Sequence, residues 1–188
     1  IRLGLLVLAV LSARSFSYQW VLGDPVRAWE DAVARAPNAP DAICALAESY
    51  AELGDPRAEE LFLQATRLDP TNYRYWANLG VYYGDRGRLA QAAEALRLAV
   101  LRNPGEASVH DYRGQILLQL GREDEAAAEF EAAISAEPTF ATAYANFAEL
   151  LLNRGEGERA RRLIETGAPF VSDQDEAEAF ARLRARLP

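Results

Sequence analysis

The sequence contains very few of the residues that cross-link a chain through a disulfide bond or a bound metal ion. Its 188 residues include one cysteine, one histidine and no methionine. Cys44 alone cannot close an internal disulfide, and Cys44 with His110 cannot supply the ligand set of a structural zinc site. A disulfide scaffold and a zinc module are therefore excluded. Half of the residues are hydrophobic, which is enough to bury a sizeable core in one compact domain or a short repeat array.

Basic residues are also in short supply. The chain has 20 Lys and Arg against 28 Asp and Glu, for a net charge of −8. This balance argues against nucleic-acid binding, which depends on clustered positive charge. The charge is unevenly spread, because residues 1–22 hold Arg2 and Arg14 but no acid and so carry +2, which leaves −10 for the rest. This contrast predicts that residues 1–22 and the rest of the chain lie in different solvents.

The first of these regions, residues 1–22, resembles the end of a membrane segment. An apolar run over Leu3–Leu11 is followed by Phe16, Tyr18 and Trp20, and such rings collect at the bilayer interface. A helix over residues 1–13 would reach only about 20 Å of the roughly 30 Å of hydrocarbon. We therefore expect a membrane anchor that begins upstream of Ile1, in agreement with the missing initiator methionine. A signal-peptide remnant and an ordinary buried helix are the alternatives, although no basic leader precedes the run.

A repeat governs the remainder of the chain. Prolines at 37, 70, 104 and 138 are spaced by 33, 34 and 34 residues. The clearest copy, over residues 73–106, has Trp76, Leu79, Gly80, Tyr83, Gly87, Ala92, Leu96, Ala99 and Pro104. The next has His110, Gly114, Leu117, Gly121, Ala126, Phe130, Ala133 and Pro138, and the following one has Tyr144, Phe147, Ala148, Leu151, Gly155, Ala160 and Ile164.

This pattern resembles the tetratricopeptide repeat. The resemblance implies an all-α solenoid of antiparallel helical hairpins that binds proteins, with no catalytic residue, no cofactor and no small-molecule substrate. The expected organisation is an apolar segment at 1–22, a half repeat at 23–39, four full repeats at 40–72, 73–106, 107–140 and 141–171, and a capping helix at 172–188.

Each recurring residue type has a physical role in such a hairpin. A small residue lets the two helices of a unit approach closely, as at Ala47, Gly80, Gly114 and Ala148. A glycine ends each first helix in a left-handed conformation, as at Gly54, Gly87, Gly121 and Gly155. The prolines end the second helices.

The two ends of the array need helices of their own. At the start, Asp24-Pro25 reads as N-cap and first residue of a second-type helix with Trp29, Ala32 and Val33 facing inward. At the far end, Ser172 or Asp173 is expected to cap a final helix running to about Leu187, with an apolar stripe of Ala177, Phe180, Leu183 and Leu187 that covers the core. The last full repeat has Gly167 for the usual alanine and Ser172 for the proline, so an irregular connection is expected there.

Few residues suggest chemistry. His110 stands where the repeat holds a bulky packing residue, so we expect a partly buried structural histidine. Asp41 and Glu48 should raise the pKa of Cys44 and leave its thiol inert. The acid-rich stretches at 123–125 and 173–178 fall at helix N-termini, which favour negative charge. No phosphate-binding loop, nucleophile elbow or paired His and carboxylate motif occurs in the sequence.

The resemblance implies a partner groove lined by first-helix positions. The positions expected to form it are Asp41, Glu48, Glu52, Arg74, Asn78, Asp85, Asp111, Gln115, Asn146 and Glu149, with Cys44, Ala77, Val81, Gln119, Thr142, Ala145 and Asn153 beside them. This lining is acidic to neutral. The basic clamp with which some family members hold a C-terminal carboxylate is absent apart from Arg74, Asn78 and Asn146, so a basic or neutral polar partner is expected.

These observations predict a non-enzymatic, membrane-tethered scaffold that assembles or stabilises a membrane protein complex. An extracytoplasmic, periplasmic repeat domain is expected. Two alternatives remain open. Residues 14–37, with Trp20 and Trp29, resemble the junction between the last membrane helix and the first repeat in polytopic glycosyltransferase-like proteins with C-terminal repeats. The third possibility is a secreted binding protein whose first residues were a signal peptide.

Overall fold

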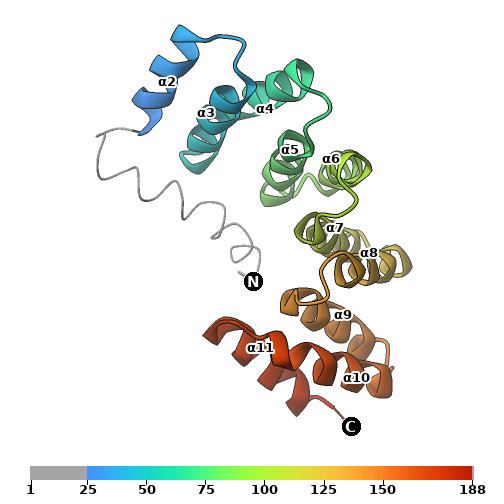
Figure 1. Cartoon of the computed structure of the whole chain (residues 1–188). Coiled ribbons are helices and arrows are strands. Elements are labelled where there is room, and N and C mark those ends of the chain that lie inside the picture. The colour runs from blue at the N-terminus through green and yellow to red at the C-terminus, as the bar shows by residue number, and fades with distance from the viewer. Residues whose placement is uncertain (1–24, 188) are drawn as a thin grey trace. The chain divides into compact units, whose positions relative to one another are not determined.

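The computed structural model describes residues 25–187, and this part of the chain folds into α-helices joined by short turns, with no strand among them. The helices follow one another along the chain in antiparallel pairs (Figure 1). Their bounds are α2 Pro25–Arg35, α3 Pro40–Glu52, α4 Arg57–Leu68, α5 Tyr73–Asp85, α6 Leu89–Arg102, α7 Ala107–Gln119, α8 Glu123–Ala136, α9 Ala141–Asn153, α10 Gly157–Gly167 and α11 Gln174–Ala185, with a 3-10 helix η1 at Ala168–Phe170. The all-α hairpin architecture predicted from the repeat is confirmed.

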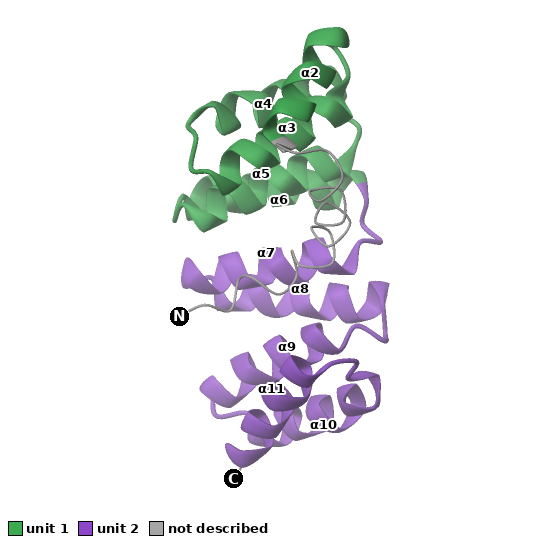
Figure 2. Cartoon of the chain, turned by 90° about the vertical axis from the view of Figure 1, so that its left-hand side faces the viewer, with its two compact units in different colours: residues 1–102 green, residues 103–188 purple. Residues whose placement is uncertain are grey.

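The chain divides into two compact units, coloured separately in Figure 2. Unit 1 ends at Arg102 and contains α2 to α6, while unit 2 starts at Asn103 and contains α7 to α11 with η1. Within unit 1 the main hairpins are α3 with α4 and α5 with α6. Within unit 2 they are α7 with α8 and α9 with α10, and α11 packs against α9. We call α3, α5, α7 and α9 first helices, and α4, α6, α8 and α10 second helices.

The glycines predicted to end the first helices have the left-handed conformation. The φ angles of Gly54, Gly87, Gly121 and Gly155 lie between 69° and 77°, and no other described residue has a positive φ. At Gly87, the backbone N–H groups of Arg86, Gly87 and Arg88 donate to carbonyls in the last turn of α5. A side chain at this φ would clash with the backbone, so glycine reverses the chain at the lowest cost.

The small residues at the helix crossings are also confirmed. A Cβ atom added to Gly80 on α5 would lie 2.6 Å from Leu96 Cγ on α6. A Cβ atom added to Gly114 on α7 would lie 2.6 Å from Phe130 Cε1 on α8. Both distances are far below van der Waals contact, so each hairpin is closed by a large side chain seated on a glycine.

A Gly80→Leu substitution should therefore force α5 and α6 apart. We expect the free energy of unfolding to fall by about 1 to 3 kcal/mol or more, because the added side chain overpacks a filled site. Thermal or urea denaturation followed by circular dichroism measures this change. Val81→Leu is the matched control, since Val81 neighbours Gly80 but is only half-buried. Equal stability of Gly80→Leu and the control would contradict the packing described here.

The N-terminal half repeat differs in part from the prediction. The helix begins at Pro25 as expected, and the proposed N-cap Asp24 lies outside the described residues. Ala32 and Val33 are half-buried, but Trp29 is 40% exposed and is not a core residue among the described neighbours. The reason is that α2 packs mainly against α3 and has no second helix on its other side within the described part. Tyr50 Oη on α3 donates to Glu30 Oε1 at 2.6 Å and ties the two helices together.

The C-terminal helix is capped by Asp173, one of the two predicted residues, whose carboxylate accepts from the N–H of Glu176 at 2.9 Å. Helix α11 ends at Ala185, slightly before the expected Leu187. Phe180 and Leu183 are buried and Leu187 packs against the same core, but Ala177 is exposed. The prediction for Ala177 was wrong because Glu176 takes the inward place in the first turn, where it accepts from Thr142 Oγ1 at 3.0 Å.

The irregular connection expected after the last full repeat is present. Helix α10 ends at Gly167 and passes into η1. A Cβ atom on Gly167 would lie 2.6 Å from Tyr144 Cβ and 2.9 Å from Phe180 Cζ. Glycine stands here because α9 and α11 both approach the end of α10, which leaves no room for the alanine that the repeat pattern predicts.

The predicted membrane segment, residues 1–22, lies outside the described residues. Within residues 25–187, none of the helices combines the length and the apolar character that crossing a bilayer requires.

Candidate functional site

The first-helix face of unit 1 carries an excess of negative charge. Helix α3 contributes Asp41, Glu48 and Glu52, and α5 contributes Asp85, all of them exposed. Arg74 is the one basic residue among the positions predicted to line this face. Although Asp85 is exposed, neighbouring protein atoms limit the hydration of its carboxylate and raise its pKa. We call Asp41, Glu48, Glu52 and Asp85 the acidic face of unit 1.

Hydrogen bonds between neighbouring repeats hold this face in shape. Tyr75 Oη on α5 donates to Asp41 Oδ1 on α3 at 2.6 Å. Asn78 Nδ2, also on α5, donates to Cys44 Sγ at 3.3 Å and to Glu48 Oε1. These bonds fix the carboxylates of Asp41 and Glu48 relative to α5. The face is therefore preorganised, which lowers the ordering cost of binding a partner.

The thiol within this network is unreactive, as predicted. Cys44 is 4% exposed, and burial, followed by the charge of Glu48, raises its pKa to about 12. Sequence reasoning found the carboxylate contribution and missed the larger effect of burial. The pKa of Glu48 is also raised, because neighbouring protein limits its hydration even though the side chain is exposed. A thiol protonated throughout the physiological range is neither a nucleophile nor a metal ligand.

Unit 2 places Asp111 differently from the prediction. This residue was expected to line the groove and face solvent, but its exposure is 0%. Its carboxylate accepts from Gln115 Nε2 at 2.8 Å and from Asn146 Nδ2 at 2.9 and 3.0 Å. Burial raises its pKa to about 6, and the two amide donors oppose that rise. Asp111 is therefore a structural link between α7 and α9, and the prediction that it contacts a partner was wrong.

The predicted groove positions on α9 are largely engaged by α11. Arg186 Nη1 lies 3.2 Å from Glu149 Oε1, and Arg186 Nη2 donates to Asn153 Oδ1 at 2.7 Å. Thr142 is bound to Glu176, as described above. Gln115 and Asn146 are half-buried around Asp111, which leaves Gln119 as an exposed predicted lining residue of α7. Unit 2 thus offers much less open acidic surface on its first-helix face than unit 1.

His110 is the packed structural histidine that its repeat position predicts. It is 6% exposed, with Nδ1 2.7 Å from Glu129 Oε2 and Nε2 3.1 Å from the Pro104 carbonyl oxygen. The hydrogen bond with Glu129 raises the pKa of His110. Arg113 Nη1 pairs with the same carboxylate. These three side chains form a buried charged cluster between α7 and α8.

Sequence reasoning missed the residues that complete these networks: Tyr75, Glu176 and Arg186. A usable signal was present, because Asp41 and Tyr75, Cys44 and Asn78, and Thr142 and Glu176 are each separated by 34 residues. Polar residues 34 positions apart face each other, both between first helices and between α9 and α11. Pairs of polar residues 34 positions apart therefore predict the hydrogen bonds between neighbouring repeats.

Within residues 25–187 no group of three or more His, Cys, Asp or Glu side chains is placed to hold a metal ion. What the first-helix faces offer is fixed carboxylate and amide groups on paired helices, which is the surface of a helical-repeat scaffold for protein interaction.

The chain belongs to the tetratricopeptide repeat family. Three models of this family match it, over residues 61–94, 78–139 and 117–187. A curated relative, the inactive TPR repeat-containing thioredoxin TTL3 of Arabidopsis thaliana, is 35% identical over 79 residues, which is 42% of this chain. The chain spans only 11% of that relative's length.

Solved structures share the fold at low identity. MamA is 23% identical with a TM-score of 0.69, over 84% of this chain and 89% of its own. PilF of Pseudomonas aeruginosa is 22% identical with a TM-score of 0.72, over 97% of this chain and 87% of its own. TTC0263 of Thermus thermophilus, described as a thermophilic TPR protein, is 24% identical with a TM-score of 0.69, over 92% and 96%.

Proposed function

We propose that this protein is a non-enzymatic scaffold that holds a basic segment of a partner protein against the acidic face of unit 1. The observation that carries the proposal is the set of four exposed carboxylates on α3 and α5, two of which, Asp41 and Glu48, are held by hydrogen bonds from the next repeat. An anionic partner would be repelled there. Charge complementarity of this kind raises the association rate and selects partners, and it weakens as salt rises.

The proposal includes a membrane tether. The apolar run and interfacial aromatics in residues 1–22, with a charge of +2 against −10 for the rest, support an anchor that keeps the repeats next to a bilayer. The partner would then be a subunit of a membrane protein complex that the scaffold assembles or stabilises. The repeat domain would lie on the extracytoplasmic, periplasmic side.

Charge reversal tests the acidic face. The variant Glu52→Lys with Asp85→Lys should bind a short lysine-rich peptide about tenfold more weakly than the unaltered chain, with a flatter salt response. Fluorescence anisotropy of the labelled peptide at low and physiological salt measures both quantities. The matched control is Glu60→Lys with Glu94→Lys, which makes the same charge change on the second helices of unit 1. If control and test variants lost affinity equally, only net charge would matter and the site would be misplaced.

Vesicle flotation tests the tether. The full chain should float with phospholipid vesicles, and a chain starting at Gly23 should remain at the bottom of the gradient because it lacks the apolar run. Circular dichroism of the shorter chain provides the control for folding. Equal flotation of the two chains would remove residues 1–22 as the membrane determinant, without bearing on the acidic face.

A further inference from the structure

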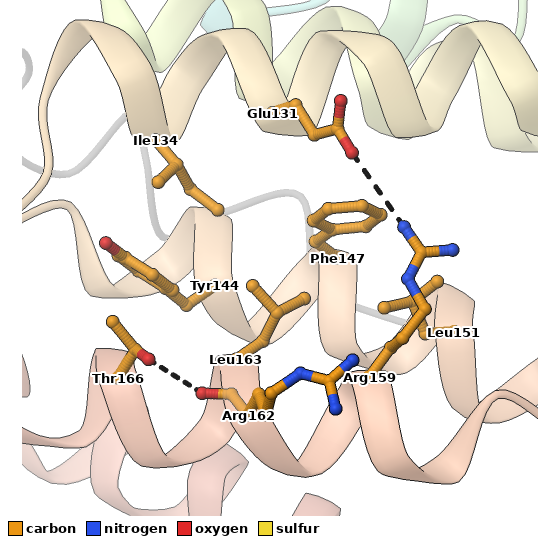
Figure 3. Close-up of a pocket in the computed structure, with 9 residues that line it drawn as sticks. All are labelled: Glu131, Ile134, Tyr144, Phe147, Leu151, Arg159, Arg162, Leu163 and Thr166. Carbon is orange, nitrogen blue, oxygen red and sulfur yellow. Dashed lines mark hydrogen bonds and ion pairs between the residues drawn. The ribbon is translucent and has the colours of Figure 1, made fainter.

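The second-helix side of unit 2 contains a cavity of about 330 Å³, whose lining includes none of the predicted groove residues (Figure 3). Helix α9 forms its floor, and α8 and α10 form its walls. It is lined by Glu131, Ile134, Tyr144, Phe147, Leu151, Arg159, Arg162, Leu163 and Thr166. The volume lies at the lower end of the range for ligand pockets, roughly 300 to 1,000 Å³, and suits one or two large side chains.

A comparison with the preceding repeat explains why the floor is apolar. The positions of Tyr144, Phe147 and Leu163 correspond, 34 residues earlier, to His110, Arg113 and Glu129. In that repeat Glu129 contacts both His110 and Arg113 in the cluster described above. In this repeat the same positions are uncharged. The apolar surface open to an incoming group comes mainly from the half-buried Ile134 and Leu163, above a floor in which Tyr144 and Phe147 are at most 5% exposed (Figure 3).

The rim of the cavity is positively charged on the α10 side. Arg159 is already engaged, with Glu156 Oε2 at 2.5 Å and Glu131 Oε1 at 4.0 Å. Arg162 is exposed and forms no ion pair with another described residue. In Figure 3 the guanidinium of Arg159 reaches toward Glu131, whereas that of Arg162 does not. Arg162 is thus the cation available to an incoming carboxylate.

We propose that this cavity binds a short segment of a partner protein that inserts one bulky apolar side chain and presents an adjacent acidic residue to Arg162. The apolar lining recognises the first group, and the Arg162 guanidinium recognises the second. The cavity consists of other residues than the acidic face of unit 1. It prefers an acidic ligand, whereas the acidic face prefers a basic one. The two sites can therefore fail or succeed independently.

Fluorine NMR of short capped peptides tests the proposal with the full chain. The first peptide has 4-fluorophenylalanine followed by aspartate, and the second has lysine in place of the aspartate. The aspartate peptide should bind with a dissociation constant of about 0.1 to 1 mM, as expected for a single anchored side chain. The lysine peptide should bind at least about tenfold more weakly, because Arg162 repels its charge.

Variants of the chain locate the binding. Arg162→Glu should weaken the aspartate peptide about tenfold and bring the lysine peptide to the affinity that the aspartate peptide had. Arg182→Glu is the matched control, since it makes the same charge change at an exposed position of α11 that does not line the cavity, and it should change neither affinity. Ile134→Trp, which fills the cavity without altering charge, should abolish binding of both peptides.

Three results would overturn the proposal. Equal affinity of the two peptides would show that Arg162 does not discriminate between aspartate and lysine in the ligand. Unchanged binding to Ile134→Trp, with circular dichroism showing an intact helical fold, would place the fluorinated ring elsewhere. If the fluorine signal of the aspartate peptide did not broaden at millimolar concentration, the peptide would not bind and the proposed ligand class would be wrong. None of these results bears on the separate test of the acidic face of unit 1, which uses a different, lysine-rich peptide.

Discussion

Replacement of Asp111 by lysine is expected to lower the free energy of unfolding by about 3 to 5 kcal/mol, enough to unfold unit 2 in a marginally stable chain. Asp111 is completely buried, and its carboxylate has donors only from Gln115 and Asn146 among the described residues. A lysine there would bury a positive charge facing two amide N–H groups. As they are oriented, both amides point N–H donors at this site, and neither can accept a hydrogen bond from the ammonium group without turning over.

The matched control for Asp111→Lys is Glu52→Lys, which makes the same charge change at an exposed first-helix position. That variant should change stability by less than about 0.5 kcal/mol. Urea denaturation followed by circular dichroism compares the two. A melting curve for Asp111→Lys that coincides with that of Glu52→Lys would show that Asp111 faces solvent after all and belongs to the open groove.

The second expected result is a loss of stability as the pH rises through 6, caused by the same carboxylate. The pKa of Asp111 is raised by burial from 3.8 to about 6, so the folded chain holds this proton more tightly than the unfolded chain. A raised folded-state pKa gives stability that is complete below the unfolded pKa and is lost as pH rises through the folded pKa. The loss between about pH 4 and about pH 7 should be of the order of 3 kcal/mol.

Other groups titrate over the same interval, so the measurement is a comparison with Asp111→Asn. His110 also has a raised pKa and loses its contribution above its own folded value, in the same direction. Asparagine cannot ionise, so the variant should keep the contribution of His110 and lose that of Asp111. Urea denaturation at about pH 4.5 and about pH 7 should therefore give a smaller stability difference for Asp111→Asn than for the unaltered chain. Identical differences would contradict the buried, ionisable state of Asp111.

The fold was predictable because its determinants are local and repeated. Gly87 and its three counterparts mark the reversals, since few other residues tolerate that φ, and Gly80 and Gly114 mark the crossings. The 34-residue spacing then dictates which helices pair. Each of these signals can be read within a single repeat, so none depends on knowing the complete structure.

The candidate site was predictable only in part, because burial at a first-helix position depends on the next repeat. Asp111 occupies the position that Cys44, Ala77 and Ala145 occupy in other repeats, and Cys44 and Ala145 are also buried. An asparagine of the following repeat closes over that position, Asn78 over Cys44 and Asn146 over Asp111. Comparing the four repeats would have identified the position as inward-facing, since three of the four residues are small and uncharged.

The covering of α9 could not be found from the repeat pattern. Arg186 lies beyond the repeats, and its contacts with Glu149 and Asn153 follow from the way α11 packs on α9. The irregular end of α10 at Gly167 sets that packing. The capping helix α11 covers predicted groove positions of α9, whereas Asp41, Glu48, Glu52 and Asp85 of unit 1 remain exposed.

Carbodiimide coupling tests the central claim most directly. The sequence contains no lysine, so activated carboxylates of the folded chain find their amine partners almost entirely on an added lysine-rich peptide. Mass spectrometry of the coupled product at physiological salt should place the links on Asp41, Glu48, Glu52 and Asp85. Links spread over exposed acids in general, with Glu60, Glu94 and Glu131 coupled as often as the acidic face of unit 1, would contradict the account.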